Sequence, residues 1–123
     1  MKNYDARFGG ILRLFGRDGQ ARLRRAHVCL VGIGGVGSWA VEALARSGIG
    51  TLTLVDLDDV CISNVNRQLH AVTGDFGKPK VEAMAARVQL IHPDGVVHAQ
   101  HMLFTASTAE QLLAPQYDCV LDA

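Results

Sequence analysis

Four glycines lie in the turn between an apolar run and a stretch of helical spacing, and this arrangement constrains the fold more than any other feature. Residues 28–31 are apolar and predict a short buried strand. Residues 35–47 place apolar side chains on one helical face, namely Val36, Trp39, Ala40, Ala43 and Leu44. A glycine turn between a strand and a helix leaves backbone N–H groups open to a phosphate. The segment therefore predicts a phosphate-binding turn formed by Gly32, Gly34, Gly35 and Gly37.

The rest of the chain repeats the alternation of strands and helices. Further strands are predicted at residues 51–55, 96–99 and 118–123, and further helices at residues 78–91 and 106–113, with a short helical turn around residues 64–68. This alternation predicts an α/β fold with a Rossmann-like, doubly wound and mostly parallel sheet. The pattern ends on a strand with no helix to cover it, although parallel strands are normally covered on both faces. We therefore expect a sheet truncated after about four strands, with residues 26–123 forming the N-terminal part of a longer domain.

Residues 1–25 predict a basic helical arm that is broken near Gly9-Gly10 and Gly16. The arm holds seven lysines and arginines against two aspartates, whereas the whole chain has 12 residues of each sign. Its net charge is thus +5, which leaves −5 for the remainder of the chain. Such an arm suits nucleotide phosphates or a nucleic acid, and it is equally typical of a solvated helix face.

Cysteine, histidine and hydropathy patterns exclude several classes of protein. The three cysteines form no C-x-x-C pair, which argues against disulfides and a structural zinc, and Cys29 and Cys119 lie in apolar runs that predict core positions. The five histidines show no metal-ligand spacing, and we interpret all of them as structural: His27, His70, His92, His98 and His101. No apolar run approaches the ~20 residues that span a bilayer. The start of the chain has no apolar signal core, so we expect a cytoplasmic protein without a membrane partner.

Carboxylates follow the second predicted strand. Asp56 lies 24 residues after Gly32, where an acid commonly accepts hydrogen bonds from ribose hydroxyls. Asp58 is a second candidate for contact with a nucleotide or Mg²⁺, whereas Asp59 is better explained by turn formation. On these residues alone, NAD(P) or FAD is as acceptable a ligand as ATP.

Cationic and amide side chains in the next segment favour ATP. Asn64, Arg67 and Gln68 follow the predicted ribose acid, and Lys80 opens the next helix. Hydride transfer has no evident use for an arginine and a lysine here. Phosphoryl or adenylyl transfer does, because negative charge builds up on the reacting phosphate. A surface arginine and a solvated lysine are the structural alternatives for Arg67 and Lys80.

At this point the chain resembles the ThiF/MoeB/HesA superfamily, the adenylating enzymes related to ubiquitin-activating enzyme. The resemblance extends from the helical arm to the last residue, through several motifs in the same order. These are Gly32-Ile33-Gly34-Gly35-Val36-Gly37-Ser38, Asp56-Leu57-Asp58-Asp59-Val60, Ser63-Asn64-Val65-Asn66-Arg67-Gln68, Gly77-Lys78-Pro79-Lys80-Val81-Glu82, Ile91-His92-Pro93 and Val120-Leu121-Asp122-Ala123.

One branch of the superfamily is the most similar, the tRNA threonylcarbamoyladenosine dehydratases. The opening Arg7-Phe8-Gly9-Gly10 and the stretch Asn66-Arg67-Gln68-Leu69-His70-Ala71 resemble that branch. The resemblance implies an enzyme that uses ATP to activate the carboxylate of the threonylcarbamoyl group at adenosine 37 of tRNA and then closes a ring with loss of water. It also implies a homodimer and sulfur-relay proteins as partners.

The resemblance assigns roles to individual residues. It places ATP phosphates on the glycine turn, with the ribose on Asp56 and Asp58 beside it. Asn64, Arg67 and Lys80 would contact the triphosphate and stabilise the transition state, with Gln68 orienting that group.

Two departures from the family pattern limit this assignment. The position of the arm's arginine finger is matched by Gly10, so that Arg7 or Arg13 is left as a substitute. The Mg²⁺-binding aspartate of the family is expected just beyond Ala123, and Asp122 matches a preceding structural acid. We therefore expect no metal ligand within the chain, and the chain alone to be inactive.

Three alternatives remain open. An activator of a ubiquitin-like sulfur carrier would use the same adenylation on a protein C-terminus. An NAD(P)- or FAD-dependent oxidoreductase would use only the glycine turn and Asp56. A non-catalytic nucleotide-binding or dimerisation module would describe the chain as it stands.

Overall fold

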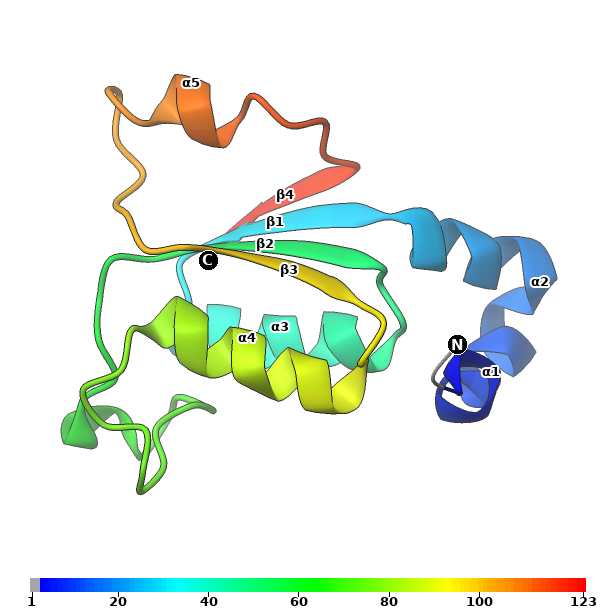
Figure 1. Ribbon diagram of the computed structural model, residues 1–123, viewed down its shortest axis with the longest axis horizontal. Helices are drawn as coiled ribbons and strands as arrows, with labels where there is room; N and C mark the ends of the chain where they lie inside the picture. Colours follow the sequence, from blue (N-terminus) through cyan, green and yellow to red (C-terminus); the bar gives the residue numbers. More distant parts are fainter. Residues whose placement is uncertain (1–2) are drawn as a thin grey trace.

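The structure, a computed structural model, describes residues 3–123 and contains one parallel four-stranded sheet (Figure 1). The strands lie in the order β3-β2-β1-β4, and every neighbouring pair is parallel. Their bounds are β1 His27–Val31, β2 Thr51–Val55, β3 Val96–Gln100 and β4 Cys119–Asp122. The chain winds outward from β1 to β3 and then returns to the other side of β1, so the α/β, Rossmann-like prediction is confirmed.

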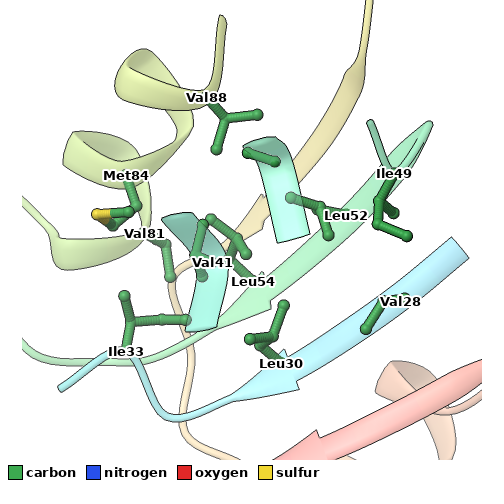
Figure 2. Close-up of a cluster of buried hydrophobic side chains, with 11 residues drawn as sticks. Val28, Leu30, Ile33, Val41, Ile49, Leu52, Leu54, Val81, Met84 and Val88 are labelled. Carbon is green, nitrogen blue, oxygen red and sulfur yellow. The ribbon is translucent and has the colours of Figure 1, made fainter. Parts of the chain in front are cut away.

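Two helices cover one face of the sheet and build the main core against it (Figure 2). They are α3 Gly37–Arg46 and α4 Lys80–Ile91, and each follows a strand as the sequence predicts. Alternate strand residues point toward these helices, because successive side chains in a strand lie on opposite faces. The buried side chains are Val28, Leu30, Ile33, Val41, Ala45, Ile49, Leu52, Leu54, Val81, Met84 and Val88.

The buried face of α3 differs from the predicted one. Ser38, Val41 and Ala45 are buried, whereas Val36 and Trp39 are 71% and 54% exposed. The helix begins at Gly37, which lies directly against the end of β1, and this contact fixes which side of the helix faces the sheet. Ala40 and Leu44 of the predicted face do pack against the core, whereas the prediction was wrong for Val36, Trp39 and Ala43. It was built on hydrophobicity alone and missed the small residues at the contact.

The opposite face of the sheet is only partly covered. Helix α5 is a four-residue segment, Ala109–Leu112, and is shorter than the predicted residues 106–113, since a side-chain-bonded turn occupies the residues before it. Its Leu112 packs on Cys29 and Val55. Cys119 is exposed, so its predicted core position was wrong, because β4 is an edge strand.

The N-terminal segment folds as α1 Tyr4–Arg7 and α2 Gly9–Arg25, with a kink at Gly16. The predicted breaks are therefore confirmed, since positive φ at Gly16 (75°) is accessible to glycine. Lys2, which contributes to the predicted basic charge, lies outside the described residues. The division at residue 25 into an arm and a domain stays a prediction. Within residues 3–123, no helix is both long and apolar enough to cross a membrane.

Aromatic packing attaches the first helix to the sheet. Tyr4, Phe8 and His92 form a cluster with ring centroids 4.7 to 5.3 Å apart. The Tyr4 hydroxyl donates to the Gly48 carbonyl, and the ring of His92 lies 3.3 Å from the Ile49 carbonyl. Burial lowers the pKa of His92, and burial likewise lowers the pKa of His70. Both imidazoles are therefore neutral at pH 7 in the folded state.

This burial predicts a loss of stability in mild acid. An unfolded histidine takes up a proton as the pH falls through about 6.5, whereas the folded ones resist it, so unfolding becomes easier below that value. We expect the melting temperature to be lower at pH 5.5 than at pH 7.5, with up to about 1 kcal/mol lost per histidine. The His92→Phe variant, which keeps a ring against Tyr4 and Phe8, should show a smaller difference between the two pH values by calorimetry. An equal difference in the variant would contradict the assignment to His92.

Candidate functional site

The glycine turn follows β1, whose two neighbours in the sheet are β2 and β4. The chain passes from β1 to β2 on one side and later returns to β4 on the other side, so the strand order reverses at β1. Ligands of open α/β sheets bind at the carboxyl ends of the strands at this point. Gly32 has a φ of 96°, which favours glycine, and its N–H donates to the Val55 carbonyl at 2.9 Å. The turn is thereby joined to the end of β2.

Gly37 permits the close packing of the turn on α3. A Cβ added at Gly37 would lie 1.7 Å from the carbonyl oxygen of Gly32, which no side chain tolerates. At Gly34 and Gly35 the added carbon would meet nothing nearer than 3.8 and 3.9 Å. The backbone N–H groups of these two residues have no hydrogen-bond partner within residues 3–123. At Gly32 the added carbon would lie 2.1 Å from the carbonyl oxygen of Ala123. The turn therefore has two glycines required by packing, Gly32 and Gly37, and two that leave backbone open to a ligand, Gly34 and Gly35.

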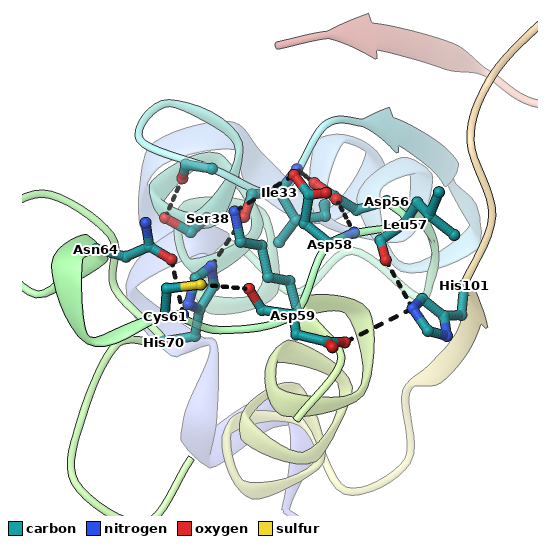
Figure 3. Close-up of polar contacts among 12 residues, drawn as sticks. Ile33, Ser38, Asp56, Leu57, Asp58, Asp59, Cys61, Asn64, His70 and His101 are labelled. Carbon is teal, nitrogen blue, oxygen red and sulfur yellow. Dashed lines mark hydrogen bonds and ion pairs between the residues drawn. The ribbon is translucent and has the colours of Figure 1, made fainter. Parts of the chain in front are cut away.

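Asp56 joins the turn to the end of β2 (Figure 3). Its Oδ2 accepts the N–H of Ile33 at 2.7 Å, and its Oδ1 accepts the N–H of Asp58 at 2.8 Å. The carboxylate thus has a structural role that the sequence did not predict, beside the predicted ribose contact. The Asp58 side chain is 76% exposed and remains available to a ligand.

An apolar wall stands beside Asp56. A hollow of about 240 Å³ is lined by Val31, Gly32, Val55, Asp56, Leu57, Asp58, Met102, Leu103 and Phe104. The segment 102–104 follows β3, whose carboxyl end lies at the same edge of the sheet. A flat, apolar base fits against such a wall while its sugar lies near a carboxylate. Sequence reasoning missed this wall, although the apolar run directly after a strand end was a usable signal.

Asn64 and Gln68 lie in the segment beneath the turn. Asn64 is 8% exposed, and its Oδ1 accepts the N–H of Cys61 at 2.9 Å, so the side chain holds the 3₁₀ turn η1 Ile62–Asn64 in place (Figure 3). Gln68 is also 8% exposed, and its buried Oε1 has no hydrogen-bond partner within residues 3–123. The Gln68 Nε2 lies 3.8 Å from the position of a Cβ at Gly34. The structure therefore places Gln68 against the open part of the turn.

Three hydrogen bonds attach residues 67–70 to the turn and α3. The Ser38 hydroxyl accepts the N–H of Leu69 at 3.2 Å. The indole N–H of Trp39 donates to the Arg67 carbonyl at 2.9 Å. The Nε2 of His70 bonds to the Ile33 carbonyl at 2.8 Å (Figure 3). These contacts explain why Trp39 is on the outer side of its helix: its polar edge holds the backbone of Arg67.

His70 supports the glycine turn, a role that the sequence did not predict. It is 3% exposed, and its Nδ1 is buried without a partner among residues 3–123. Burial lowers the pKa of His70, the bond to the Ile33 carbonyl opposes this, and the nearby charge of Lys80 reinforces it. The neutral ring therefore carries its proton on Nε2 and donates to the glycine turn. The interpretation of His70 as a structural histidine therefore holds, and the part of the fold that it stabilises is the glycine turn.

The two predicted cations differ in their surroundings. Arg67 is exposed, and its Nη1 donates to the Ser63 carbonyl at 3.0 Å and to Asn66 Oδ1 at 2.8 Å. Lys80 is only 7% exposed, so it is not a solvated lysine, and its Nζ lies 4.0 Å from Asp58 Oδ2. Its own N–H donates to the Asp58 carbonyl, which places the first residue of α4 beside the loop after β2.

A divalent metal lacks a complete set of ligands in the described part of the chain. No group of three or more histidines, cysteines, aspartates or glutamates within residues 3–123 is arranged to hold a metal ion. Mg²⁺ binds through carboxylates and keeps several waters, and Asp58 alone offers an exposed carboxylate beside Lys80. The residues present do not form a Mg²⁺ site by themselves, and we derive no chemical step through the metal.

Comparison with known proteins agrees with this geometry. The chain matches the ThiF family over residues 8–123. It belongs to the ThiF family. The tRNA threonylcarbamoyladenosine dehydratase of Haemophilus influenzae is 54% identical over 98% of the chain, and the Escherichia coli enzyme of the same name is 48% identical over 95%. The more distant molybdopterin-synthase adenylyltransferase of E. coli is 38% identical over 91% of the chain.

Solved structures give the same result. The crystal structure of E. coli tRNA N6-threonylcarbamoyladenosine dehydratase in complex with ATP superposes with a TM-score of 0.98 at 46% identity, covering 100% of this ThiF-family chain and 51% of that one. The same enzyme in complex with AMP gives a TM-score of 0.97. The chain spans about half the length of the curated relatives that it matches, 46% and 44% for the two dehydratases.

The structure gathers the predicted site residues of this ThiF-family chain around one turn. The cofactor-binding candidates lie on the turn itself, at the end of β2 and beneath the turn: Gly32, Gly34, Gly35, Gly37, Asp56, Asp58 and Gln68. The catalytic candidates lie in the segment beneath the turn and at the start of α4: Asn64, Arg67 and Lys80. Their roles in catalysis stay predictions.

Paired glycine substitutions test the two parts of the turn. Gly37→Ala forces a carbon onto the Gly32 carbonyl, so we expect a melting temperature lower by several degrees and weak ATP binding, from a cost of about 1–3 kcal/mol. Gly35→Ala has room within the fold, so its melting temperature should stay near that of the unaltered protein. Its ATP affinity should still fall, because the new methyl group covers open backbone. Equal melting temperatures for both variants, or unchanged ATP affinity in Gly35→Ala, would contradict this division.

Proposed function

We propose that this chain is the ATP-binding part of a dehydratase that acts on threonylcarbamoyladenosine at position 37 of tRNA. Its nucleotide turn belongs to a Rossmann-like adenylation domain over residues 26–123, which continues in the whole enzyme. The observation that carries the proposal is a glycine turn that is fixed by Asp56 and lies directly over Arg67 and Gln68. The similarity to tRNA threonylcarbamoyladenosine dehydratases supports the choice of substrate.

The reaction needs a carboxylate converted into a good electrophile. A carboxylate oxygen of the threonylcarbamoyl group attacks the α-phosphorus of ATP, and pyrophosphate leaves with the electrons of the broken P–O bond. A nitrogen or oxygen of the carbamoyl group then attacks the acyl carbon of the adenylate and loses its proton. The ring closes as the C–O bond to AMP breaks, and AMP leaves with the former carboxylate oxygen. The modified base has lost the elements of one water, and ATP has been converted into AMP and pyrophosphate.

The site residues suit a reaction in which negative charge builds up on the phosphate oxygens. Open N–H groups at Gly34 and Gly35 can donate to phosphate oxygens without reorganisation. Arg67 offers a planar fork to the phosphates, and the buried Lys80 offers a point charge whose field is poorly screened. Asn64 and Gln68 would donate amide N–H groups to the same oxygens.

The remaining features of the whole enzyme follow the family resemblance. We propose that the functional unit is a cytoplasmic homodimer and that Mg²⁺ accompanies ATP, with its ligand supplied beyond Ala123. In the dimer, Arg7 or Arg13 would take the place of the arginine finger that Gly10 lacks. A sulfur-relay protein would be a further partner of the whole enzyme.

A sulfur-carrier activator is the second candidate, because the similarity to adenylyltransferases of that type extends over nine-tenths of the chain. The same turn and cations would serve the adenylation of a protein C-terminus. The oxidoreductase alternative has lost its basis, since the ThiF family match extends beyond the glycine turn and Asp56.

Substitution of the two cations tests their role in the transition state. Arg67→Ala and Lys80→Ala in the full-length protein should each lower the adenylation rate by about 10² or more while changing ATP affinity far less. ATP-pyrophosphate exchange gives the rate, and calorimetric titration gives the affinity. Melting temperatures serve as the control, because Lys80 is buried. Equal losses of rate and affinity would show that the two residues bind ATP in the ground state only.

The substrate is tested by mass analysis of nucleosides. Full-length protein incubated with ATP and threonylcarbamoyl-modified tRNA should produce a nucleoside lighter by one water. Omission of ATP should leave the nucleoside unchanged. No loss of mass, together with adenylation of a carrier protein bearing a C-terminal Gly-Gly, would favour the second candidate. Tighter binding of NAD than of ATP would contradict adenylation altogether.

A further inference from the structure

A cationic hollow lies at the end of the molecule opposite the glycine turn. Helices of a parallel α/β fold run against the strands, so α3 and α4 end at the amino edge of the sheet, where α1 also lies (Figure 1). A hollow of about 350 Å³ at this end is lined by Arg7, Phe8, Arg46, Arg87, Leu90 and Ile91. We call it the arginine hollow. None of its residues lies at the nucleotide site of the same chain, and only Arg7 is also a candidate for the arginine finger of a partner subunit.

Glu42 holds two of the arginines in place. Arg87 donates from Nε and Nη2 to the two carboxylate oxygens at 2.6 and 2.8 Å, and Arg46 donates from Nε at 2.7 Å. The Glu42 side chain is 13% exposed, and hydrogen bonding from Arg87 lowers its pKa, so it stays ionised. One buried anion thus orients two cations and leaves a surplus of positive charge.

Arg46 and Arg87 line the hollow and retain N–H donors that are not used by Glu42. Within residues 3–123, Arg46 donates to Glu42 only from Nε, and Arg87 donates to Glu42 from Nε and Nη2. Their side chains are 60% and 45% exposed. Arg7 donates to the Leu90 and Ile91 carbonyls at 3.5 and 3.3 Å, which neutralises the negative end of α4 beside the hollow. An anion in the hollow therefore meets guanidinium groups rather than helix carbonyls.

The surroundings indicate an extended polyanion rather than a small ion. Leu90 lines the hollow and is 80% exposed, so the hollow offers apolar contact to a sugar as well as charge. Helix α2 at the same end of the molecule adds five exposed arginines and one acid, namely Arg13, Arg17, Arg22, Arg24, Arg25 and Asp18. A row of phosphates linked by sugars matches this combination.

We propose that the arginine hollow binds phosphates of the tRNA backbone, remote from the adenosine that reacts. This inference rests on the proposed function for the choice of RNA. Guanidinium forks suit phosphodiester oxygens, and backbone contacts position a nucleic acid without reading its sequence. The hollow would hold the RNA stem while the modified adenosine occupies the nucleotide site of the whole enzyme.

Arg46→Gln in the full-length protein tests the proposal, because Arg87 remains to pair with Glu42. Loss of one phosphate contact should weaken tRNA binding roughly tenfold near 0.1 M salt and reduce the slope of log K against log salt by about 1. Fluorescence anisotropy with labelled tRNA measures both. ATP affinity, measured by calorimetric titration, should not change. Arg46→Lys should recover part of the affinity but not the fork geometry.

Arg17→Gln is the matched control, since it removes the same charge from α2, which adds to the general positive field but lies outside the hollow, and it should weaken tRNA binding less than Arg46→Gln does. An equal weakening by both variants would overturn the hollow as a site and leave only general attraction. Unchanged tRNA binding by Arg46→Gln, or tighter binding of inorganic phosphate alone than of tRNA, would also overturn it. Failure of the proposed function would be seen separately, as an unaltered protein that binds tRNA but removes no water from it.

Discussion

The close approach of α3 to the carbonyl of Gly32 is the constraint on which the rest of the site depends. Only a residue without a side chain fits at Gly37, and this contact decides which side of the helix faces the sheet. Ser38 and Trp39 then project toward residues 67–70 and bind their backbone. Gly37 thus positions the segment that carries Arg67 through packing.

Asp56 complements this packing with charge. Its carboxylate accepts two backbone N–H groups, one from the turn and one from the loop after β2. Because Lys80 donates to the carbonyl of Asp58, the same loop also positions the start of α4. The ends of β1 and β2 and the start of α4 are therefore coupled through short polar contacts, which hold this edge of the sheet rigid.

The order of elements was predictable because strand and helix periods differ and the glycine turn marks their junction. The positions of Gly32, Asp56 and Arg67 at one edge followed from parallel topology and from family resemblance. What the sequence could not supply was contact between side chains. Trp39 was predicted to be a core residue from its hydrophobicity, but its indole N–H donates to the Arg67 carbonyl on the exposed side of the helix. Lys80 could equally have been a solvated lysine, since its surroundings depend on the loop that contains Asp58, 22 residues earlier in the sequence. Cys119 was misplaced because apolar neighbours in sequence do not reveal an edge strand.

The unpartnered oxygen of Gln68 has an energetic consequence for the whole domain. The Gln68 Oε1 is buried and no donor among residues 3–123 reaches it, and a buried acceptor that is left without a donor costs about 1–3 kcal/mol. A ligand or bound water that supplies a donor removes the cost, and that gain adds to the free energy of binding. A ligand that donates to Gln68 binds the folded state and not the unfolded chain, so its binding raises the free energy of unfolding of the whole domain.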